Sequence, residues 1–168
     1  LLDWVAWSLQ HEAQKPSWAL MLFSEEKGTG KSTIGVVLEA LFGQANTAKL
    51  DGVDKLVAKH ADRILDKKLI IAEEVQIGER STAGNKLKDL ITSERTTVEP
   101  KYQPTKTIPL KACFFLTTNH KPLWLEAGER RYYIIEITHE GHAQGPKNDE
   151  FAELVGAVME QISEPEQL

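Results

Sequence analysis

The chain of 168 residues lacks several features that would define a class of protein. Its single cysteine, Cys113, excludes an internal disulfide framework and a cysteine-based zinc site. No run of about 18 uninterrupted apolar residues is present, and the first residues lack the basic and apolar stretches of a secretory signal. We therefore expect no membrane span and a cytoplasmic location. Internal repeats are also absent, which favours one domain over the whole of 1–168.

Positive charge is in deficit. The 20 lysines and arginines are outnumbered by 25 aspartates and glutamates, which gives a net charge of −5. This balance argues against a protein that coats nucleic acid through bulk positive charge, because that binding depends on neutralising many phosphates. A few lysines that contact a strand locally are compatible with an otherwise acidic surface.

Short apolar runs are predicted to form the buried strands of a sheet. Each is bounded by polar or glycine-bearing loops, a pattern typical of parallel strands that are covered on both faces. They lie at 18–23, 67–72, 112–117 and 131–137.

Stretches with helical periodicity separate these strands, which indicates an α/β fold with a mostly parallel sheet. The stretch 46–68 is mixed and predicts one or two short helices, and 77–84 is predicted to be a loop. In 96–109, around Pro100 and Pro104, we expect extended segments that pair as a hairpin. The predicted helices are a leading helix in 1–17, the helices 31–42 and 85–92, and a C-terminal helix at 149–162.

A glycine-rich loop joins the first strand to the helix at 31–42. Its glycines let backbone N–H groups face phosphate oxygens, Lys31 can reach the β- and γ-phosphates, and the hydroxyl of Ser32 can bind Mg²⁺. Glu25 stands where the common pattern has its first glycine, so we expect its carboxylate to point away from the phosphates. The bland alternative is a turn that binds nothing. The predicted nucleotide-binding residues are Glu26, Lys27, Gly28, Thr29, Gly30, Lys31, Ser32 and Thr33.

Polar side chains end the next two apolar strands. Glu73 and Glu74 follow the strand at 67–72, where one carboxylate can hold Mg²⁺ and the other can orient an attacking water. Asn119 follows the strand at 112–117 and offers an uncharged hydrogen-bonding group for the γ-phosphate or that water. Taken singly, the two acids could be a solvated strand end and Asn119 a turn residue.

An arginine pair and a basic hairpin complete the candidate residues. Arg130 and Arg131 would ordinarily be surface residues, yet a hydrolase that assembles as a ring needs an arginine to complete its neighbour's site. In the hairpin, Lys101 beside Tyr102 can combine phosphate attraction with base stacking. From the residues alone, a solvated hairpin is an equal alternative. Lys86 and Lys88, on the preceding helix, are interpreted as surface charges, with assistance in DNA contact as the alternative.

Together these motifs resemble the superfamily 3 helicases, a viral and plasmid branch of the ring-forming AAA+ ATPases. The likeness is closer to the helicase modules of phage and poxvirus-type primase-helicases and phage primase-polymerases. It implies a P-loop NTPase fold of AAA+ type, with a central, mostly parallel sheet flanked by helices and an inserted β-hairpin. The segments that carry it are 28–33, 69–74, 87–92, 100–102, 115–120 and 129–131.

The resemblance assigns roles to residues of this sequence. Lys31 and Ser32 correspond to the Walker A phosphate and Mg²⁺ residues, and Asn119 to the polar sensor. Lys101 and Tyr102, on a hairpin at about 97–108, correspond to the contacts with single-stranded DNA. Glu73 and Glu74 correspond to the Walker B acids, with Glu73 at the metal. Arg130 or Arg131 is similar to the arginine finger given to a neighbouring subunit.

The function implied is an ATP-dependent DNA helicase motor that uses ATP and Mg²⁺ and pulls single-stranded DNA through a hexameric ring. Because the first residue is not Met, we expect a piece of a longer replication protein with a fused primase or polymerase domain, from a phage or prophage in a bacterial host. One alternative is an assembly or loading module that binds ATP and DNA without unwinding. A small-molecule P-loop kinase is disfavoured, because no acceptor-binding lid is evident.

Overall fold

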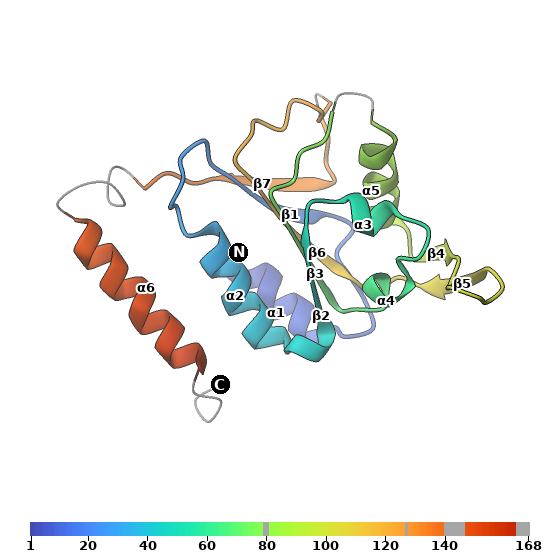
Figure 1. Cartoon of the computed structure of the whole chain (residues 1–168), viewed down its shortest axis with the longest axis horizontal. Helices are drawn as coiled ribbons and strands as arrows, with labels where there is room; N and C mark the ends of the chain where they lie inside the picture. The colour runs from blue at the N-terminus through green and yellow to red at the C-terminus, as the bar shows by residue number, and fades with distance from the viewer. Residues whose placement is uncertain (79–80, 127, 140–146, 164–168) are drawn as a thin grey trace.

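A five-stranded parallel sheet forms the centre of the computed structural model, which describes residues 1–78, 81–126, 128–139 and 147–163 (Figure 1). The strand order is β2-β3-β6-β1-β7, and every pairing in this sheet is parallel. The four strands expected from the sequence are all confirmed. The strands are β1 (Ala19–Phe23), β2 (Thr47–Asp51), β3 (Leu69–Glu73), β6 (Cys113–Thr118) and β7 (Tyr132–Glu136).

Helices cover both faces of the sheet, because side chains along each strand alternate between them. Leu20 and Leu22 pack toward α1 (Leu2–Gln10) and α2 (Lys31–Phe42). Ala19 and Met21 pack on the other face. That face is covered by α3 (Asp54–Val57), α4 (Asp62–Leu65) and α5 (Thr82–Thr92).

The strand β2 was not expected from the sequence. Its segment, in 46–68, was predicted to hold only short helices, which are present as α3 and α4, and a short 3₁₀ helix, Gln44–Asn46, precedes the strand. Only Thr47 and Leu50 of this edge strand are buried, so it has no apolar run to reveal it. Pairing with β3 along its whole length holds it in the sheet.

Two predicted helix boundaries need correction. The helix α5 begins at Thr82 rather than at 85, because the hydroxyl of Ser81 accepts a hydrogen bond from the Ala83 N–H at 3.2 Å and caps the helix. The leading helix ends at Gln10 rather than near 17. Lys68 then donates hydrogen bonds to two carbonyls of the following segment, those of His11 and Gln14.

The expected hairpin is confirmed as a separate antiparallel ribbon. It consists of β4 (Arg95–Val98) and β5 (Lys106–Pro109), and below it the Leu110 N–H donates to the Glu94 carbonyl at 2.8 Å. The ribbon lies on the side of the molecule opposite to the C-terminal helix (Figure 1).

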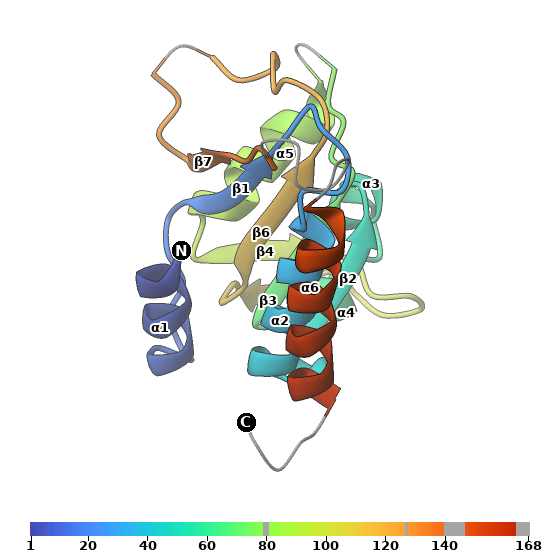
Figure 2. The same ribbon diagram turned by 90° about the vertical axis from the view of Figure 1, so that its left-hand side faces the viewer.

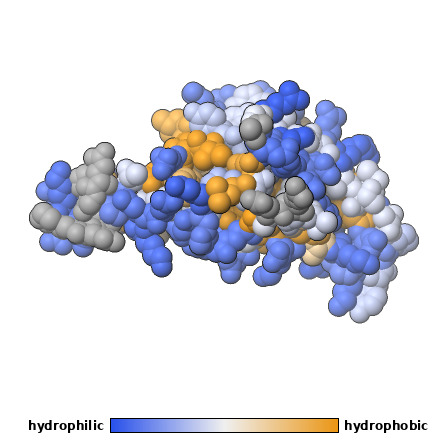
Figure 3. All heavy atoms as spheres, turned by 90° about the horizontal axis from the view of Figure 1, so that it is seen from above, coloured by the Kyte–Doolittle hydropathy of each residue, from blue (hydrophilic) through white to orange (hydrophobic). Residues whose placement is uncertain are grey.

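The C-terminal helix α6 (Asn148–Ser163) lies along α2 (Figure 2). It has no fully buried residue, unlike α1, α2 and α5. Among the described helices, none has the length and apolarity needed to cross a bilayer. Seen from above, the surface is mainly hydrophilic, with apolar side chains gathered near the middle (Figure 3).

Candidate functional site

The glycine-rich loop connects the end of β1 to the start of α2. Gly28 and Gly30 have φ angles of 76° and 79°, left-handed conformations that glycine adopts without a steric penalty. Gly30 is the N-cap of α2, and no side chain caps this end of the helix. The N–H groups of the first turn therefore remain available to an anion, beside the positive end of the helix dipole.

A cavity of about 440 Å³ opens over this loop. Its volume is in the usual range for a small-molecule site. It brings the loop together with the ends of β3 and β6, because the carboxyl ends of parallel strands lie at the same edge of the sheet. One turn of α6 also lines it. The lining residues are 27–33, Glu74, Thr117, Asn119, Phe151 and Val155.

Lys31 is the buried cation of this cavity, with 8% of its surface exposed. Its Nζ donates to Thr29 Oγ1 at 3.1 Å, and within the described parts of the chain it forms no ion pair. Burial lowers the pKa of Lys31 below its usual value, and the nearby charge of Glu74 opposes that shift. An anion in the cavity would relieve the cost of desolvating the ammonium group.

Glu74 and Asn119 face each other at the end of the sheet. The Asn119 amide donates from Nδ2 to Glu74 Oε1 at 3.0 Å, while Asn119 Oδ1 is buried without a hydrogen-bond partner in the described structure. Glu74 has a φ of 51°, which is unusual for a residue other than glycine. A carboxylate in a strained backbone, held by a side-chain amide, is the kind of arrangement that marks functional sites.

Glu73 lies deeper, against α2. Its Oε2 pairs with Lys49 Nζ at 3.5 Å, and its Oε1 is buried with no hydrogen-bond partner among the described residues. Gly35 makes room for it, since a Cβ there would lie 3.6 Å from Glu73 Oε1. A hydroxyl from Ser32 and an unsatisfied carboxylate oxygen are hard oxygen ligands, so these residues fit Mg²⁺ by their chemistry.

The two acids at the start of the loop turn away from the cavity. Glu25 is not in the left-handed region, and its carboxylate pairs with Lys121 Nζ at 3.2 Å, as expected for a side chain that avoids the phosphates. Glu26 does not line the cavity, although it was grouped with the nucleotide-binding residues. Its Oε2 accepts a hydrogen bond from the His139 N–H at 3.0 Å.

The arginine pair lies at the opposite end of the sheet. The Ala19 N–H, at the start of β1, donates to the Arg131 carbonyl at 2.8 Å. The five residues of β1 separate this end from the phosphate loop by about 16 Å at 3.3 Å per residue. The arginines are therefore not brought together with the cavity of their own chain.

The two arginines differ in their surroundings. The Arg131 guanidinium donates from Nη1 to both Glu129 oxygens, at 3.0 and 3.1 Å. Arg130 is exposed and forms no ion pair within the part of the chain that the structure describes. Sequence reasoning could not distinguish them, because the distinction depends on which one meets Glu129.

The tip of the hairpin is also far from the cavity. Lys101 and Tyr102 are exposed, Tyr102 by 93%, and the Lys101 Nζ lies 5.2 Å from the centre of the Tyr102 ring. Tyr102 has a φ of 64°. The pair is thus presented to solvent as one cationic and aromatic surface.

Two features were missed in the sequence, one at the site and one outside it. Phe151 and Val155 of α6 line the cavity, and Phe151 Cζ lies 3.9 Å from where a Gly30 Cβ would stand. Their periodicity predicted a helix but carried no signal of its position.

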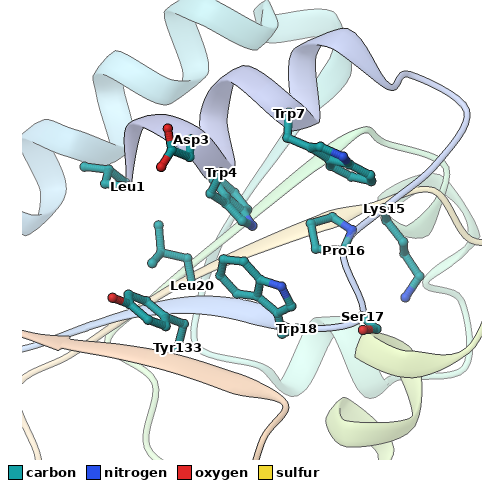
Figure 4. Close-up of a pocket in the computed structure, with 10 residues that line it drawn as sticks. All are labelled: Leu1, Asp3, Trp4, Trp7, Lys15, Pro16, Ser17, Trp18, Leu20 and Tyr133. Carbon is teal, nitrogen blue, oxygen red and sulfur yellow. The ribbon is translucent and has the colours of Figure 1, made fainter.

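A second cavity, of about 630 Å³, lies between α1 and β7 and is lined by Trp4, Trp7, Trp18 and Tyr133 among others (Figure 4).

The fold and the site define the class of this protein. A glycine-rich loop follows β1, an asparagine ends the neighbouring strand β6, and two acids end the strand beyond it, β3. This is a P-loop NTPase fold of AAA+ type. A family model described as a family of unknown function, DUF5906, matches residues 22–131, and the chain belongs to this family. Among curated proteins, none matches the sequence.

Solved structures share this fold. The NrS-1 C-terminal region, in apo form, is similar with a TM-score of 0.71 and 19% identity over 94% of this chain and 39% of that one. A JCV helicase bound to a small molecule has a TM-score of 0.52 and 15% identity over 96% and 54% of the two chains. NtrX from Brucella abortus, in complex with ATP, has a TM-score of 0.52 and 13% identity over 96% and 40%.

These likenesses confirm the fold class and, at the level of the fold, the resemblance to superfamily 3 helicases. The chain spans less than two thirds of the length of each of these structures.

Proposed function

We propose that this chain is the ATPase module of a DNA helicase motor. The observation that carries the proposal is the cavity in which the phosphate loop, Lys31, Glu74 and Asn119 meet. Arg130, which forms no ion pair among the described residues, lies at the far end of the sheet. A fold similar to that of a helicase supports it.

The phosphates of ATP would lie on the loop. The N–H groups at the start of α2 and the Lys31 ammonium neutralise them, and Ser32 with Glu73 would hold Mg²⁺. That ion, when bound, adds charge neutralisation on the phosphate oxygens. The buried ammonium of Lys31, which forms no ion pair among the described residues, is suited to this role because Glu74 compensates its charge only in part and a bound anion would add to that compensation.

Hydrolysis would depend on Glu74. Its carboxylate would orient a water and accept a proton from it as the water oxygen attacks the γ-phosphorus. The bond between the γ-phosphorus and the bridging oxygen breaks, and ADP and phosphate leave. The Asn119 amide fixes the Glu74 oxygen that it contacts and leaves its own Oδ1 free to accept from the water or a phosphate-bound proton.

The arginine that completes the site would come from a second copy. Arg130 is better suited than Arg131, because Glu129 already neutralises Arg131 while Arg130 is exposed. A head-to-tail arrangement repeats the same contact around a ring, and we propose six subunits. Lys101 and Tyr102 on each hairpin would contact the DNA backbone and bases in the channel.

The wider setting is also a proposal. The chain covers 39% of the NrS-1 C-terminal region and 54% of the JCV helicase chain, which supports a module within a longer replication protein. We propose a phage or other mobile element as its source and a fused primase or polymerase domain as its partner.

The direct test is ATP hydrolysis by the full-length protein that contains this module, with and without single-stranded DNA. Lys31→Ala is expected to lower the rate by about 100- to 1,000-fold, the usual cost of losing one group that stabilises transition-state charge. Lys121→Ala is the matched control, because Lys121 is exposed and, among the described residues, its one ion pair is with Glu25 outside the cavity. An unchanged rate in Lys31→Ala would refute the assignment of the site.

Strand displacement from a forked DNA separates the motor from the alternative, a loading module. The motor is expected to release the labelled strand in an ATP-dependent manner. ATP binding and DNA binding without displacement would favour the loader.

A further inference from the structure

A network of charges lies beside the arginine pair. Lys88 Nζ, on α5, lies 3.0 Å from Glu126 Oε1 and 3.3 Å from Glu129 Oε2. Glu129 in turn holds Arg131, through its side chain and by accepting from the Arg131 N–H at 3.0 Å. Lys88 was interpreted from the sequence as a surface charge, and the structure corrects this, because its side chain is only 11% exposed.

Glu129 is the centre of this network. Its side chain is 5% exposed. Desolvation raises the pKa of Glu129, but hydrogen bonds from Arg131 and Lys88 outweigh it, so the pKa lies below the ordinary value. The hydrogen bond to Glu126 raises the pKa of Lys88, with Glu129 adding to the effect against desolvation. Glu129 is therefore ionised and Lys88 protonated at neutral pH. Removing one of them would leave its partners poorly compensated.

The network joins two parts that the proposed motor must coordinate. On one side, α5 ends at Thr92 and leads directly into β4, which begins the hairpin at Arg95. On the other side, Glu129 and Arg131 flank Arg130 in the chain, so the backbone of Arg130 is held on both sides while its side chain remains exposed.

We propose that Lys88 is a positioning residue that couples the DNA-contacting hairpin to Arg130. The inference rests on the proposed function. A shift of the hairpin moves the end of α5, Lys88 carries that shift to Glu129, and Arg130 is presented differently to the neighbouring subunit's phosphates. DNA in the channel of one subunit thereby changes ATP hydrolysis in the next. Lys88 touches neither ATP nor DNA in this arrangement.

The contacts favour this role over direct DNA binding. A lysine that neutralises DNA phosphates must have its ammonium available to them, whereas that of Lys88 is already paired with two carboxylates, the exposed Glu126 and the buried side chain of Glu129. Lys86, on the same helix, is exposed, and its Nζ donates to the Val57 carbonyl at 2.8 Å. It provides a matched control that lies outside the network.

The experiment compares Lys88→Met, Lys88→Arg and Lys86→Met in the full-length protein. Methionine keeps most of the apolar stem and removes the charge, and arginine restores a cation. The measurements are the ATPase kcat and KM with and without single-stranded DNA, the affinity for DNA and the Tm.

Lys88→Met is expected to reduce the stimulation of kcat by DNA by about 2- to 30-fold, the range typical of residues that carry coupling. The KM for ATP and the affinity for DNA should stay within twofold of the parent, roughly the error expected for sites without shared partners. Lys88→Arg should recover most of the stimulation, and Lys86→Met should resemble the parent.

Three results would overturn the proposal. These are undiminished stimulation in Lys88→Met, a loss of stimulation matched by a loss of DNA affinity, or an equal loss in Lys86→Met. If Lys88→Met does not fold, Lys88→Gln replaces it, because glutamine also removes the charge but can still donate a hydrogen bond to a carboxylate. Undiminished stimulation in Lys88→Gln would likewise overturn the proposal. Failure of the proposed function is recognised separately, since the parent itself would then show no DNA-stimulated hydrolysis.

Discussion

The two ends of the central sheet handle their charges differently. At the carboxyl end, Lys31, Glu74 and Asn119 line a cavity, and Asn119 Oδ1 is buried there without a hydrogen-bond partner among the described residues. At the amino end, Glu129 neutralises Arg131 and leaves Arg130 exposed. The first end has the groups to bind a ligand within one chain. The second presents the Arg130 guanidinium, which is too far from the cavity of its own chain to act there. For this reason we expect the proposed motor to need a second copy of the chain.

The sharpest way to break this comparison is to disable each end in a different subunit. Arg130→Ala alone is expected to lower ATP hydrolysis by about 1,000-fold or more, as for other arginines that act in trans. A mixture of Arg130→Ala and Lys31→Ala subunits should recover part of the rate, because some interfaces then join an intact cavity to an intact arginine. Measured turnover that stays at the level of the separate variants would place Arg130 outside the reaction.

Arg131→Ala is the companion to this experiment. It removes the guanidinium that Glu129 holds and leaves Arg130 in place. Arg131→Ala should mainly lower the Tm. Its mixture with Lys31→Ala subunits should hydrolyse ATP no faster than the amount of Arg131→Ala protein in that mixture does by itself. Equal behaviour of the two arginine variants would remove the distinction drawn between them.

At the carboxyl end, Glu74→Gln is expected to slow hydrolysis by about 100- to 10,000-fold, the range for loss of a general base. ATP binding should persist, because the phosphate loop is unchanged. Binding of a fluorescent ATP analogue and single-turnover hydrolysis measure the two separately. Loss of binding with little effect on the bound rate would assign Glu74 to the nucleotide pocket only.

The hairpin offers a smaller effect that depends on neither end alone. Lys101→Ala should reduce the dependence of log K on log salt for single-stranded DNA by about 0.7 per site and diminish DNA-stimulated hydrolysis. The rate without DNA should not change. Lys55→Ala, an exposed lysine on α3, is the control, and an equal change in both variants would mean that binding depends on charge in general.

The smallest expected effect is on stability, through Lys15, a partly buried lysine. Desolvation lowers the pKa of Lys15 to about 8, against weaker opposing contributions from Cys113 and Glu94. Between that value and the ordinary lysine pKa of 10.5, the unfolded chain binds more protons than the folded chain. The contribution of Lys15 to the free energy of unfolding therefore rises with pH across this window.

Urea unfolding of the parent and Lys15→Met at pH 7.5 and at pH 9.5 tests this sign. The difference between the two proteins should shift in favour of the parent at the higher pH. A difference that is independent of pH would mean that the Lys15 pKa is ordinary in the folded state.

The parts of the fold that could be predicted were those with local causes. Three patterns depend only on residues close together in the sequence: the apolar run 18–23, the glycines that follow it and the helical period of 31–42. The structure shows them as β1, the phosphate loop and α2. The strand β2 could not be predicted, because its stability comes from pairing with β3 rather than from an apolar pattern of its own.

The site divides in the same way. The loop residues, Glu74 and Asn119 were identified because each ends or follows a recognisable strand, and parallel strands bring such ends together. The outward turn of Glu26, the place of Phe151 and the enclosure of Lys88 depend on contacts between segments distant in the sequence. No local pattern encodes those contacts.

Tyr102 lowers the stability of the free domain relative to glycine at the same position. A left-handed backbone is unfavourable for a residue with a Cβ by about 1–2 kcal/mol, and an aromatic ring that is 93% exposed gains almost nothing from burial. Glycine at this position should therefore make the free protein more stable. In the free protein, the contact between this ring and the Lys101 ammonium, 5.2 Å from the ring centre, offsets part of the strain. We expect the proposed binding of DNA at the tip of the hairpin to offset the rest.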